Sequence, residues 1–296
     1  MLLVTGASGL NGGAVVRRLS AQGVPVRALV RSLSRAANLA SLPGVQVVEG
    51  DMARPESLAA ALRGVDRAML TSSSDPAMLE VQLNFIDAAR AAGVEHIVKL
   101  SGIMPELDSA FRFARMHGQI EQHLEASGIA FTHLRAGEFM QAYFRQVPSI
   151  AAHSAIRLPM ADARIASIDV ADIADVAVLV LTTLGHAGQT YPLTGPDALS
   201  MGEVAEHISA AISKPVRYID VSPDAYLSAN LSNGMPAYTA EALVELYAER
   251  RAGKESHVFA IAEQLLGRPT RSFAEFARRH AATFNGDPSR AARSEI

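Results

Sequence analysis

Gly6, Gly9 and Gly12 lie between the apolar run Leu2–Val4 and a helical pattern near the start of the chain. Glycine at such a turn lets backbone N–H groups approach a pyrophosphate more closely than a side chain would allow, and the helix N-terminus attracts the same negative charge. A glycine triplet alone is weak evidence, but one between a strand and a helix favours a dinucleotide site over a plain turn. The residues that we expect to contact the dinucleotide here are Thr5, Gly6, Ser8, Gly9, Leu10, Asn11 and Gly12.

Arg31 directly follows the second expected strand, Val26–Val30. An acidic residue at this place binds the ribose hydroxyls in NAD-selective sites, which an arginine cannot do. A planar guanidinium instead matches a phosphate dianion, and Ser32 and Arg35 are close enough in sequence to assist. The sequence therefore favours NADP(H) over NAD(H), although a solvated surface arginine is the alternative interpretation.

Polar residues also follow the third and fourth expected strands. Asp51, beside Met52, could accept a hydrogen bond from an adenine amino group, or could cap the helix that begins near Pro55, and the two roles are compatible. The small hydroxyl residues after the fourth strand leave room for ribose and nicotinamide, or form a polar loop. We therefore include Asp51, Met52, Thr71, Ser72 and Ser73 among the expected cofactor contacts.

Ser101 lies at the carboxyl end of the fifth expected strand, where ligands of open α/β sheets gather. His117 follows on a helix, and helical spacing places it on the apolar face that carries Phe113 and Ile120. Glu121, four residues later, is within reach to orient the ring. We name Ser101 and His117 as catalytic candidates and, with Lys99, as cofactor contacts. The histidine is interpreted either as a satisfied core or cofactor-contacting group or as a proton donor.

These residues require strands that deliver their carboxyl ends to one edge. Short β-rich runs alternate with capped helical runs up to about residue 135, which predicts a parallel sheet covered by helices on both faces. Right-handed crossovers then give a doubly wound α/β fold of the Rossmann type. The expected strands are Leu2–Thr5, Val26–Val30, Val45–Glu49, Arg67–Thr71, Ile97–Ser101 and Ala130–Leu134.

The pattern changes after this point. We expect residues 1–135 plus 161–195 to form the dinucleotide-binding domain, with strands at Arg164–Ile168 and Gln189–Leu193. Residues 136–160, which look irregular, plus 196–284 would form a smaller, mostly helical C-terminal cap. The small, polar stretch 285–296 is expected to be a disordered tail.

Composition excludes several classes of protein. The 296 residues carry a formal net charge of −3, so no basic field attracts nucleic acid. Cysteine is absent, which excludes disulfides and thiolate zinc sites, and the nine histidines show no ligand pair, so we expect no metal. The longest apolar run, Ile173–Leu184, is too short to span a membrane, and the first strand leaves no room for a signal peptide. We expect a cytoplasmic protein, either a monomer or a homodimer.

As a set, the motifs resemble the NmrA-like family of atypical short-chain dehydrogenase/reductases over about residues 1–220. Each motif is weak alone, but together they are specific. Besides the glycine turn and Arg31, they are Lys99–Ser101, Ser127–Ile129, Leu134–Gly137, Phe139–Met140, Asp169–Ala174 and Tyr191–Gly195.

The resemblance implies a substrate and a set of contacts. Nearer members of the family are NAD(P)H-dependent quinone, azo-dye and triphenylmethane-dye reductases, whereas others are NADP-binding redox sensors without chemistry. By the resemblance, Ala136, Gly137 and Phe139 lie along the nicotinamide, and the acceptor pocket is walled by Met104, Phe139, Met140 and Tyr143.

One departure from the wider superfamily limits the chemistry. The usual Tyr-x-x-x-Lys pair is missing, since His117 stands at the tyrosine position and Glu121 at the lysine position. We therefore expect an NADPH-dependent reductase that passes a hydride to an electron-poor aromatic acceptor, which needs less help than a ketone. The alternative is a non-catalytic NADP(H)-binding sensor.

Overall fold

A seven-stranded parallel sheet with the order β3-β2-β1-β4-β5-β6-β9 forms the centre of the computed structural model, which describes residues 1–287. The order reverses between β1 and β4, which opens a crevice at their carboxyl ends. This arrangement confirms the doubly wound fold expected from the sequence. The strands are β1 Leu2–Val4, β2 Val26–Val30, β3 Val45–Glu49, β4 Arg67–Leu70, β5 His96–Gly102, β6 Ala130–Ala136 and β9 Gln189–Leu193.

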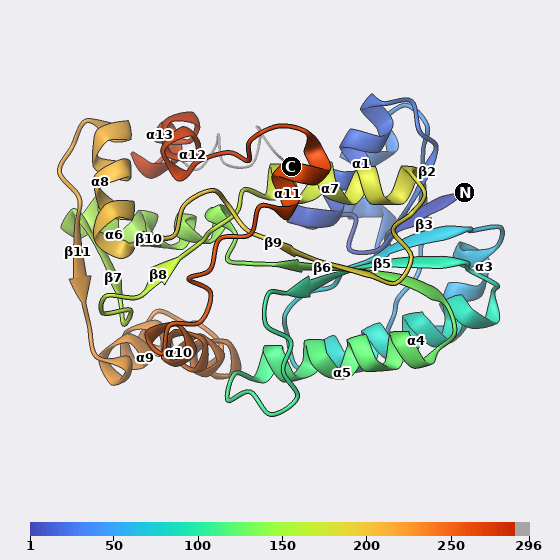
Figure 1. Ribbon diagram of the computed structural model, residues 1–296, viewed down its shortest axis with the longest axis horizontal. Coiled ribbons are helices and arrows are strands. Elements are labelled where there is room, and N and C mark those ends of the chain that lie inside the picture. The colour runs from blue at the N-terminus through green and yellow to red at the C-terminus, as the bar shows by residue number, and fades with distance from the viewer. Residues whose placement is uncertain (288–296) are drawn as a thin grey trace.

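Helices cover both faces of this sheet (Figure 1). One face packs against α1 (Leu10–Ala21), α2 (Ala37–Ala40) and α7 (Val170–Thr182), and the other against α3 (Leu58–Leu62), α4 (Met78–Ala91) and α5 (Arg112–Ala126). Because both faces are covered, the strands are nearly continuous apolar runs, and each face has its own buried core. The short helix α11 (Ile261–Leu266) lies against α7 and β9.

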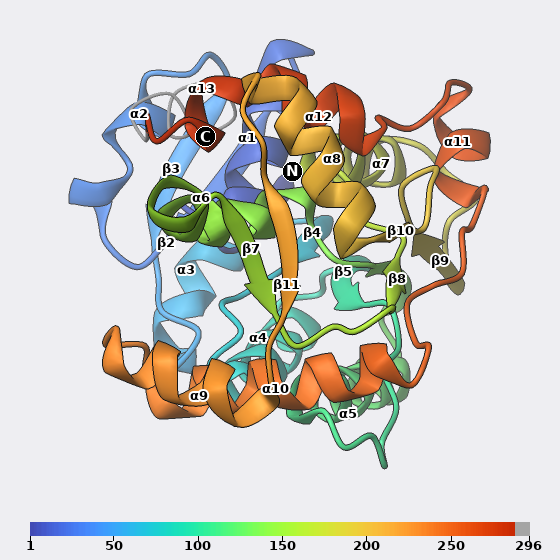
Figure 2. The same cartoon turned by 90° about the vertical axis from the view of Figure 1, so that its left-hand side faces the viewer.

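The remaining elements pack around a third apolar core beyond the carboxyl ends of the strands (Figure 2). Two small sheets contribute: β7 pairs in parallel with β11, and β8 pairs antiparallel with β10. The elements are η3 Met140–Gln146, α6 Val147–His153, β7 Ala155–Leu158, β8 Arg164–Ile165, β10 Leu199–Ser200, α8 Met201–Ile212, β11 Arg217–Asp220, α9 Pro223–Ser232, α10 Ala237–Arg251, α12 Phe273–Arg279 and α13 Ala281–Phe284.

Two expectations about this part of the chain are wrong. The stretch 136–160 is not irregular, since it forms η3, α6 and β7. The expected strand Arg164–Ile168 is reduced to β8 and lies outside the main sheet. The physical reason is local: the backbone of Ile168 bonds to Glu138 and Met140 in the loop after β6, so it cannot continue a ladder with β6.

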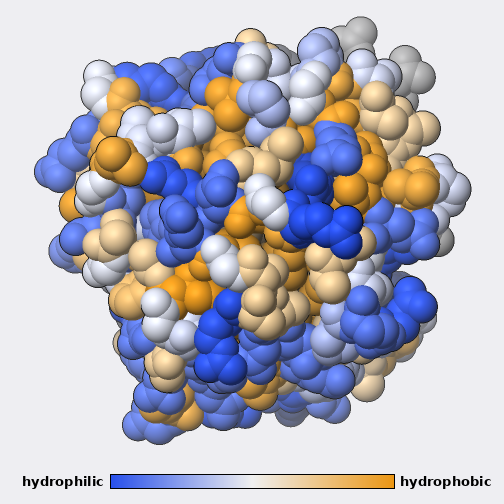
Figure 3. All heavy atoms as spheres, turned by 90° about the vertical axis from the view of Figure 1, so that its right-hand side faces the viewer, coloured by the Kyte–Doolittle hydropathy of each residue, from blue (hydrophilic) through white to orange (hydrophobic). Residues whose placement is uncertain are grey.

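The opposite end of the molecule, away from α9 and α10, presents a mixed surface on which hydrophilic and hydrophobic residues are interspersed (Figure 3). Within residues 1–287, no helix has both the length and the hydropathy needed to cross a membrane. Residues 288–296, most of the expected tail, lie outside the described residues. The division into two domains stays a prediction.

Candidate functional site

The glycine turn joins β1 to α1 in a conformation that only glycine fits. Gly6 has a φ of +56°, and a Cβ added to Gly12 would lie 2.4 Å from the Gly6 carbonyl oxygen. Helix α1 begins after Gly9, and no side chain caps it. Its first backbone N–H groups are therefore directed at whatever occupies the space in front of the helix.

Thr5 fixes the end of β1 to the end of β4. Its hydroxyl donates to the Thr71 carbonyl oxygen at 2.7 Å and accepts from the Thr71 backbone N–H at 2.8 Å. The Thr5 backbone N–H also donates to the Met69 carbonyl oxygen. The crevice between the two strands consequently has a fixed width.

A cavity of about 470 Å3 opens over this crevice. It collects most of the expected cofactor contacts: Thr5, Gly6, Ser8, Gly9, Leu10, Asn11, Gly12, Arg31, Asp51, Met52, Thr71, Ser72 and Ser73. Asn11 Oδ1 in this cavity is buried and has no hydrogen-bond partner among residues 1–287. An uncapped helix start and an unpaired buried acceptor, with an exposed guanidinium farther along, fit a phosphate-bearing dinucleotide.

The residues after β2 only partly gather at this cavity. Arg31 lines it and is exposed, whereas Ser32 does not line it and its hydroxyl lies 2.8 Å from the Ser34 hydroxyl. Arg35 belongs to the short helix η1, Leu33–Arg35. The phosphate-binding roles of these residues stay predictions.

Asp51 does not cap the following helix. The N-cap of η2 (Pro55–Ser57) is Arg54, and Asp51 Oδ1 instead accepts from the Ala53 backbone N–H at 3.0 Å. This local turn leaves the carboxylate at the cavity wall, so of the two roles considered from the sequence only the contact to the base remains open.

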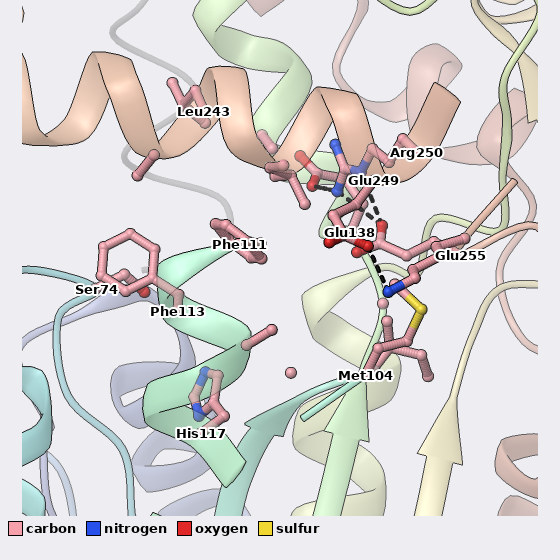
Figure 4. A pocket seen from close by; sticks show the side chains of 18 of the residues that line it. Ser74, Met104, Phe111, Phe113, His117, Glu138, Leu243, Glu249, Arg250 and Glu255 are labelled. Atoms are coloured by element: carbon pink, nitrogen blue, oxygen red, sulfur yellow. Dashed lines mark hydrogen bonds and ion pairs between the residues drawn. The ribbon is translucent and has the colours of Figure 1, made fainter. Parts of the chain in front are cut away.

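A second cavity of about 400 Å3 adjoins the first where Ser73 gives way to Ser74 (Figure 4). Its walls come from the β5–α5 loop, α5, the loop after β6 and α10. The apolar lining includes Met104, Phe111, Phe113, Phe139, Leu243 and Leu246, and Ala136, Gly137 and His117 also contribute. The space can hold a flat apolar molecule beside whatever fills the first cavity.

Two residues expected at this wall lie elsewhere. Met140 and Tyr143 pack into the third core and do not line the second cavity. The Tyr143 hydroxyl lies 3.2 Å from the Ser167 hydroxyl, and burial raises the pKa of Tyr143 to about 12. Phe139, the N-cap of η3, and Ala142 within it line the cavity instead.

One end of the second cavity carries a buried ion cluster that the sequence analysis did not identify. Arg250 of α10 is 4% exposed and pairs with Glu138 and Glu255, the latter at 2.8 Å (Figure 4). The guanidinium holds the pKa of Glu138 below its usual range, whereas burial raises the pKa of Glu255. No local pattern signals this cluster, because Glu138 and Arg250 are 112 positions apart.

The His117 ring is hydrogen-bonded to a buried lysine and not to a carboxylate. Lys99 is 0% exposed; its Nζ lies 2.9 Å from His117 Nδ1 and 3.1 Å from Ser101 Oγ. Burial lowers the pKa of Lys99 to about 7, and burial together with the nearby ammonium lowers the pKa of His117 well below its usual value. The ring is therefore neutral near pH 7.

The expected contact between Glu121 and His117 is not formed. The Glu121 carboxylate pairs with Arg135 at 2.6 Å, since β6 presents a fixed positive charge to it. Lys99 and Ser101 line neither cavity, because both lie beneath Gly102 and the His117 ring. The cofactor contacts assigned to them stay predictions.

Two residues of α5 and one of β6 form a group of three potential metal ligands. Ligand atoms of Glu121, Glu125 and His133 lie within 4.8 Å of one another. We expected no metal from the sequence, and no local spacing indicates this cluster. Arg135 and Lys99 already place positive charge next to Glu121, which opposes binding of a cation.

The doubly wound sheet and its glycine turn define a Rossmann-type α/β protein. Within that class the chain belongs to the NmrA-like family, whose sequence profile matches residues 1–276. The NAD(P)H azoreductase of Xenophilus azovorans is 39% identical over 284 residues, which is 96% of this chain and 99% of the relative.

Two solved structures are similar over nearly the whole chain. An NADPH-dependent quinone oxidoreductase of Escherichia coli, complexed with NADPH, superposes with a TM-score of 0.87 at 30% identity and covers 94% of this chain and 99% of its own. A triphenylmethane reductase of Citrobacter, complexed with NADP(H), gives a TM-score of 0.84 at 27% identity over 95% and 100% of the two chains.

Proposed function

We propose that this protein is an NADPH-dependent oxidoreductase that transfers a hydride from the nicotinamide to an electron-poor aromatic acceptor of the quinone, azo or triphenylmethane-dye type. The observation that carries the proposal is the pair of adjoining cavities at the carboxyl edge of the sheet, one polar and built on the glycine turn, the other apolar. A relative named as an azoreductase and structures of quinone and triphenylmethane reductases support the acceptor class.

The first cavity supplies the groups that hold the coenzyme. Backbone N–H groups at the start of α1 would bind the pyrophosphate, and Arg31 the additional phosphate of NADP(H). Ala136, Gly137 and Phe139 line the second cavity, where they would flank the nicotinamide. The bound coenzyme would supply the hydride, and the chain's own residues orient it and exclude water.

The second cavity favours an enzyme over the alternative of a non-catalytic NADP(H) sensor. A pure sensor does not need an apolar space of about 400 Å3 next to the nicotinamide position. His117, neutral and at the floor of this space, can donate a hydrogen bond to an acceptor without carrying a charge that would repel a dye cation.

Steady-state NADPH consumption with menadione, an azo dye and a triphenylmethane dye tests the proposal. We expect saturable turnover of at least one acceptor and weaker use of NADH. Micromolar binding of NADPH with no turnover of any acceptor would instead support the sensor, and no binding of either coenzyme by calorimetry would contradict both.

The remaining expectations from the sequence are proposals of the same kind. The formal net charge of −3 supports a protein that works without nucleic acid. We further infer that it works in the cytoplasm, as a monomer or homodimer. Light scattering coupled to size-exclusion chromatography measures the oligomeric state.

A further inference from the structure

We propose that Lys99 stores the proton that reduction of an uncharged acceptor requires and delivers it through the His117 ring. This inference deepens the proposed function, on which it relies for the identity of the acceptor. Lys99 acts through His117, so it is a positioning and proton-supplying residue, whereas His117 is the group that touches the acceptor.

The geometry allows the stored proton one direct route to the second cavity. The Lys99 side chain is fully buried and lines neither cavity, and its Nζ lies 2.9 Å from His117 Nδ1. An ammonium has only hydrogens to donate, so Nδ1 must be the acceptor of this bond. In a neutral imidazole the hydrogen then resides on Nε2, and the ring itself lines the second cavity (Figure 4).

The charged groups around Lys99 make its proton transferable at neutral pH. Facing it are His117 and Glu121 from α5 and Arg135 and His133 from β6. Burial is the largest influence and lowers the pKa of the amine to about 7; Glu121 opposes this shift and Arg135 adds to it. An ordinary lysine would hold its proton too tightly to act as an acid at this pH.

The transfer balances in atoms and charge. A bound dihydronicotinamide supplies one hydride, that is, two electrons and one hydrogen nucleus, and becomes the oxidised coenzyme. The hydride adds to one atom of the acceptor double bond, whose broken π bond leaves an anion on the other atom. The Nε2–H bond of His117 breaks as the new O–H or N–H bond forms. The Lys99 Nζ–H bond breaks as Nδ1–H forms, which leaves a neutral imidazole and a neutral amine.

The amine can regain its proton from solvent along the α5 side of the sheet. The Ser101 hydroxyl, 3.1 Å from Nζ, also bonds to the Glu121 carboxylate, and Glu121 Oε1 lies 4.0 Å from His133 Nδ1. His133 Nε2 is in turn 3.1 Å from Glu125, whose side chain is 46% exposed. These groups lead from the buried lysine towards solvent and do not line the acceptor cavity; within the described residues, the 4.0 Å step between Glu121 and His133 is not bridged by a hydrogen bond.

Acceptors that differ in their need for a proton give a sharp test. An azo bond and a quinone need a hydride and a proton, whereas a triphenylmethane dye cation becomes neutral by taking up a hydride alone. We expect Lys99→Met to lower kcat for the azo dye and menadione by about 100-fold. Reduction of the dye cation and the affinity for NADPH should stay within about twofold of wild type, because neither requires the stored proton.

For the wild-type enzyme, we expect kcat with the azo dye to fall as pH rises above about 7, because the amine then lacks its proton. The dye cation should show no such decline. Equal losses for all three acceptors in Lys99→Met would overturn the proposal, because they would indicate a purely structural role. The matched control is Lys214→Met, at an exposed lysine between α8 and β11, which should change none of these rates.

A second measurement needs neither coenzyme nor turnover. The chain has three lysines, Lys99, Lys214 and Lys254, so protein labelled with 13C at lysine Cε gives three signals. We expect one signal to titrate near pH 7, to vanish in Lys99→Met, and to titrate together with the 15Nδ1 resonance of His117. Separate titrations of the two nuclei would overturn the proposal even if the wild-type enzyme proved inactive with every acceptor, a result that by itself would refute only the proposed function.

Discussion

Arg31, after β2, and Lys99, within β5, suit different roles because they differ in exposure. Arg31 follows β2, lines the first cavity and is exposed. Lys99, within β5, is fully buried, and burial brings its pKa to about 7. Arg31 is therefore suited to binding a phosphate dianion, and Lys99 is suited to releasing a proton.

Replacing Arg31 by aspartate should reverse the preference between coenzymes. A hydrogen bond to a charged group contributes about 1.5–3 kcal/mol, so NADPH affinity should fall by roughly 10- to 100-fold. NADH affinity should stay constant or improve, since aspartate can accept from ribose hydroxyls. Calorimetric titration with both coenzymes measures the effect, with Arg63→Asp, an exposed position outside both cavities, as the control. Equal losses for NADPH and NADH would show that Arg31 does not bind the phosphate.

Where a strand is encoded by a local residue pattern, the bounds expected from the sequence agree closely with the structure. The expected bounds of β2, β3 and β9 match the structure, because each contains valine, threonine or tyrosine, which favour strands. By contrast, β7 and β8 were missed or misplaced, since each pairs with a strand far along the chain: β7 with β11, and β8 with β10. Such pairings depend on tertiary contacts that no local pattern encodes.

The glycine turn is the element that a single substitution would disrupt most directly. Alanine at position 12 would place its Cβ 2.4 Å from the Gly6 carbonyl oxygen, and backbone must move to relieve the clash. We expect Gly12→Ala to destabilise the protein by about 1–3 kcal/mol and to abolish measurable NADPH binding. Urea denaturation and calorimetry report the two effects.

Gly202→Ala in the first turn of α8 is the matched control, because a Cβ there meets nothing closer than 3.7 Å. It should leave coenzyme binding intact and slightly increase stability, since alanine is the better helix former. If Gly12→Ala bound NADPH as tightly as the wild type, the turn would not be the pyrophosphate site.

At the scale of the whole molecule, the two cavities differ in how far the sequence could define them. The first is built mainly from residues that follow strand ends, so strand positions alone located most of its lining. The second combines α5, the loop after β6 and α10, whose approach depends on how the C-terminal elements fold back. Phe139 and Met104 were predicted at its wall, but Met140 and Tyr143 were not distinguishable from them without knowing the direction of η3.

Arg250 links α10 to the loop after β6 through Glu138, so we expect Arg250→Met to weaken the packing of α10 and lower the free energy of unfolding. The Glu255 carboxylate would lose its ion pair and Glu138 would keep only the longer one with Arg145 at 3.4 Å, a loss of about 3–5 kcal/mol. The loss should be larger at pH 8 than at pH 5, because unpaired carboxyl groups can take up protons at low pH.

Urea denaturation at both pH values measures the effect. Arg251→Met removes the neighbouring, exposed guanidinium, which lies 3.6 Å from Asp220, and should change stability by less than about 0.5 kcal/mol. Similar small changes for both variants would show that the buried cluster contributes little to the packing of α10.

The reciprocal bonds between Thr5 and Thr71 bear on how a nucleotide arrives. Because the Thr5 hydroxyl both donates to and accepts from the Thr71 backbone, the distance between the ends of β1 and β4 is fixed where the two strands diverge. The phosphates therefore meet strand ends whose spacing is already fixed, so little ordering entropy remains to be lost on entry. Association is then governed by encounter and orientation. The second cavity, beside the first, is bounded partly by α10, from the C-terminal part of the chain, so its shape depends on how that helix packs.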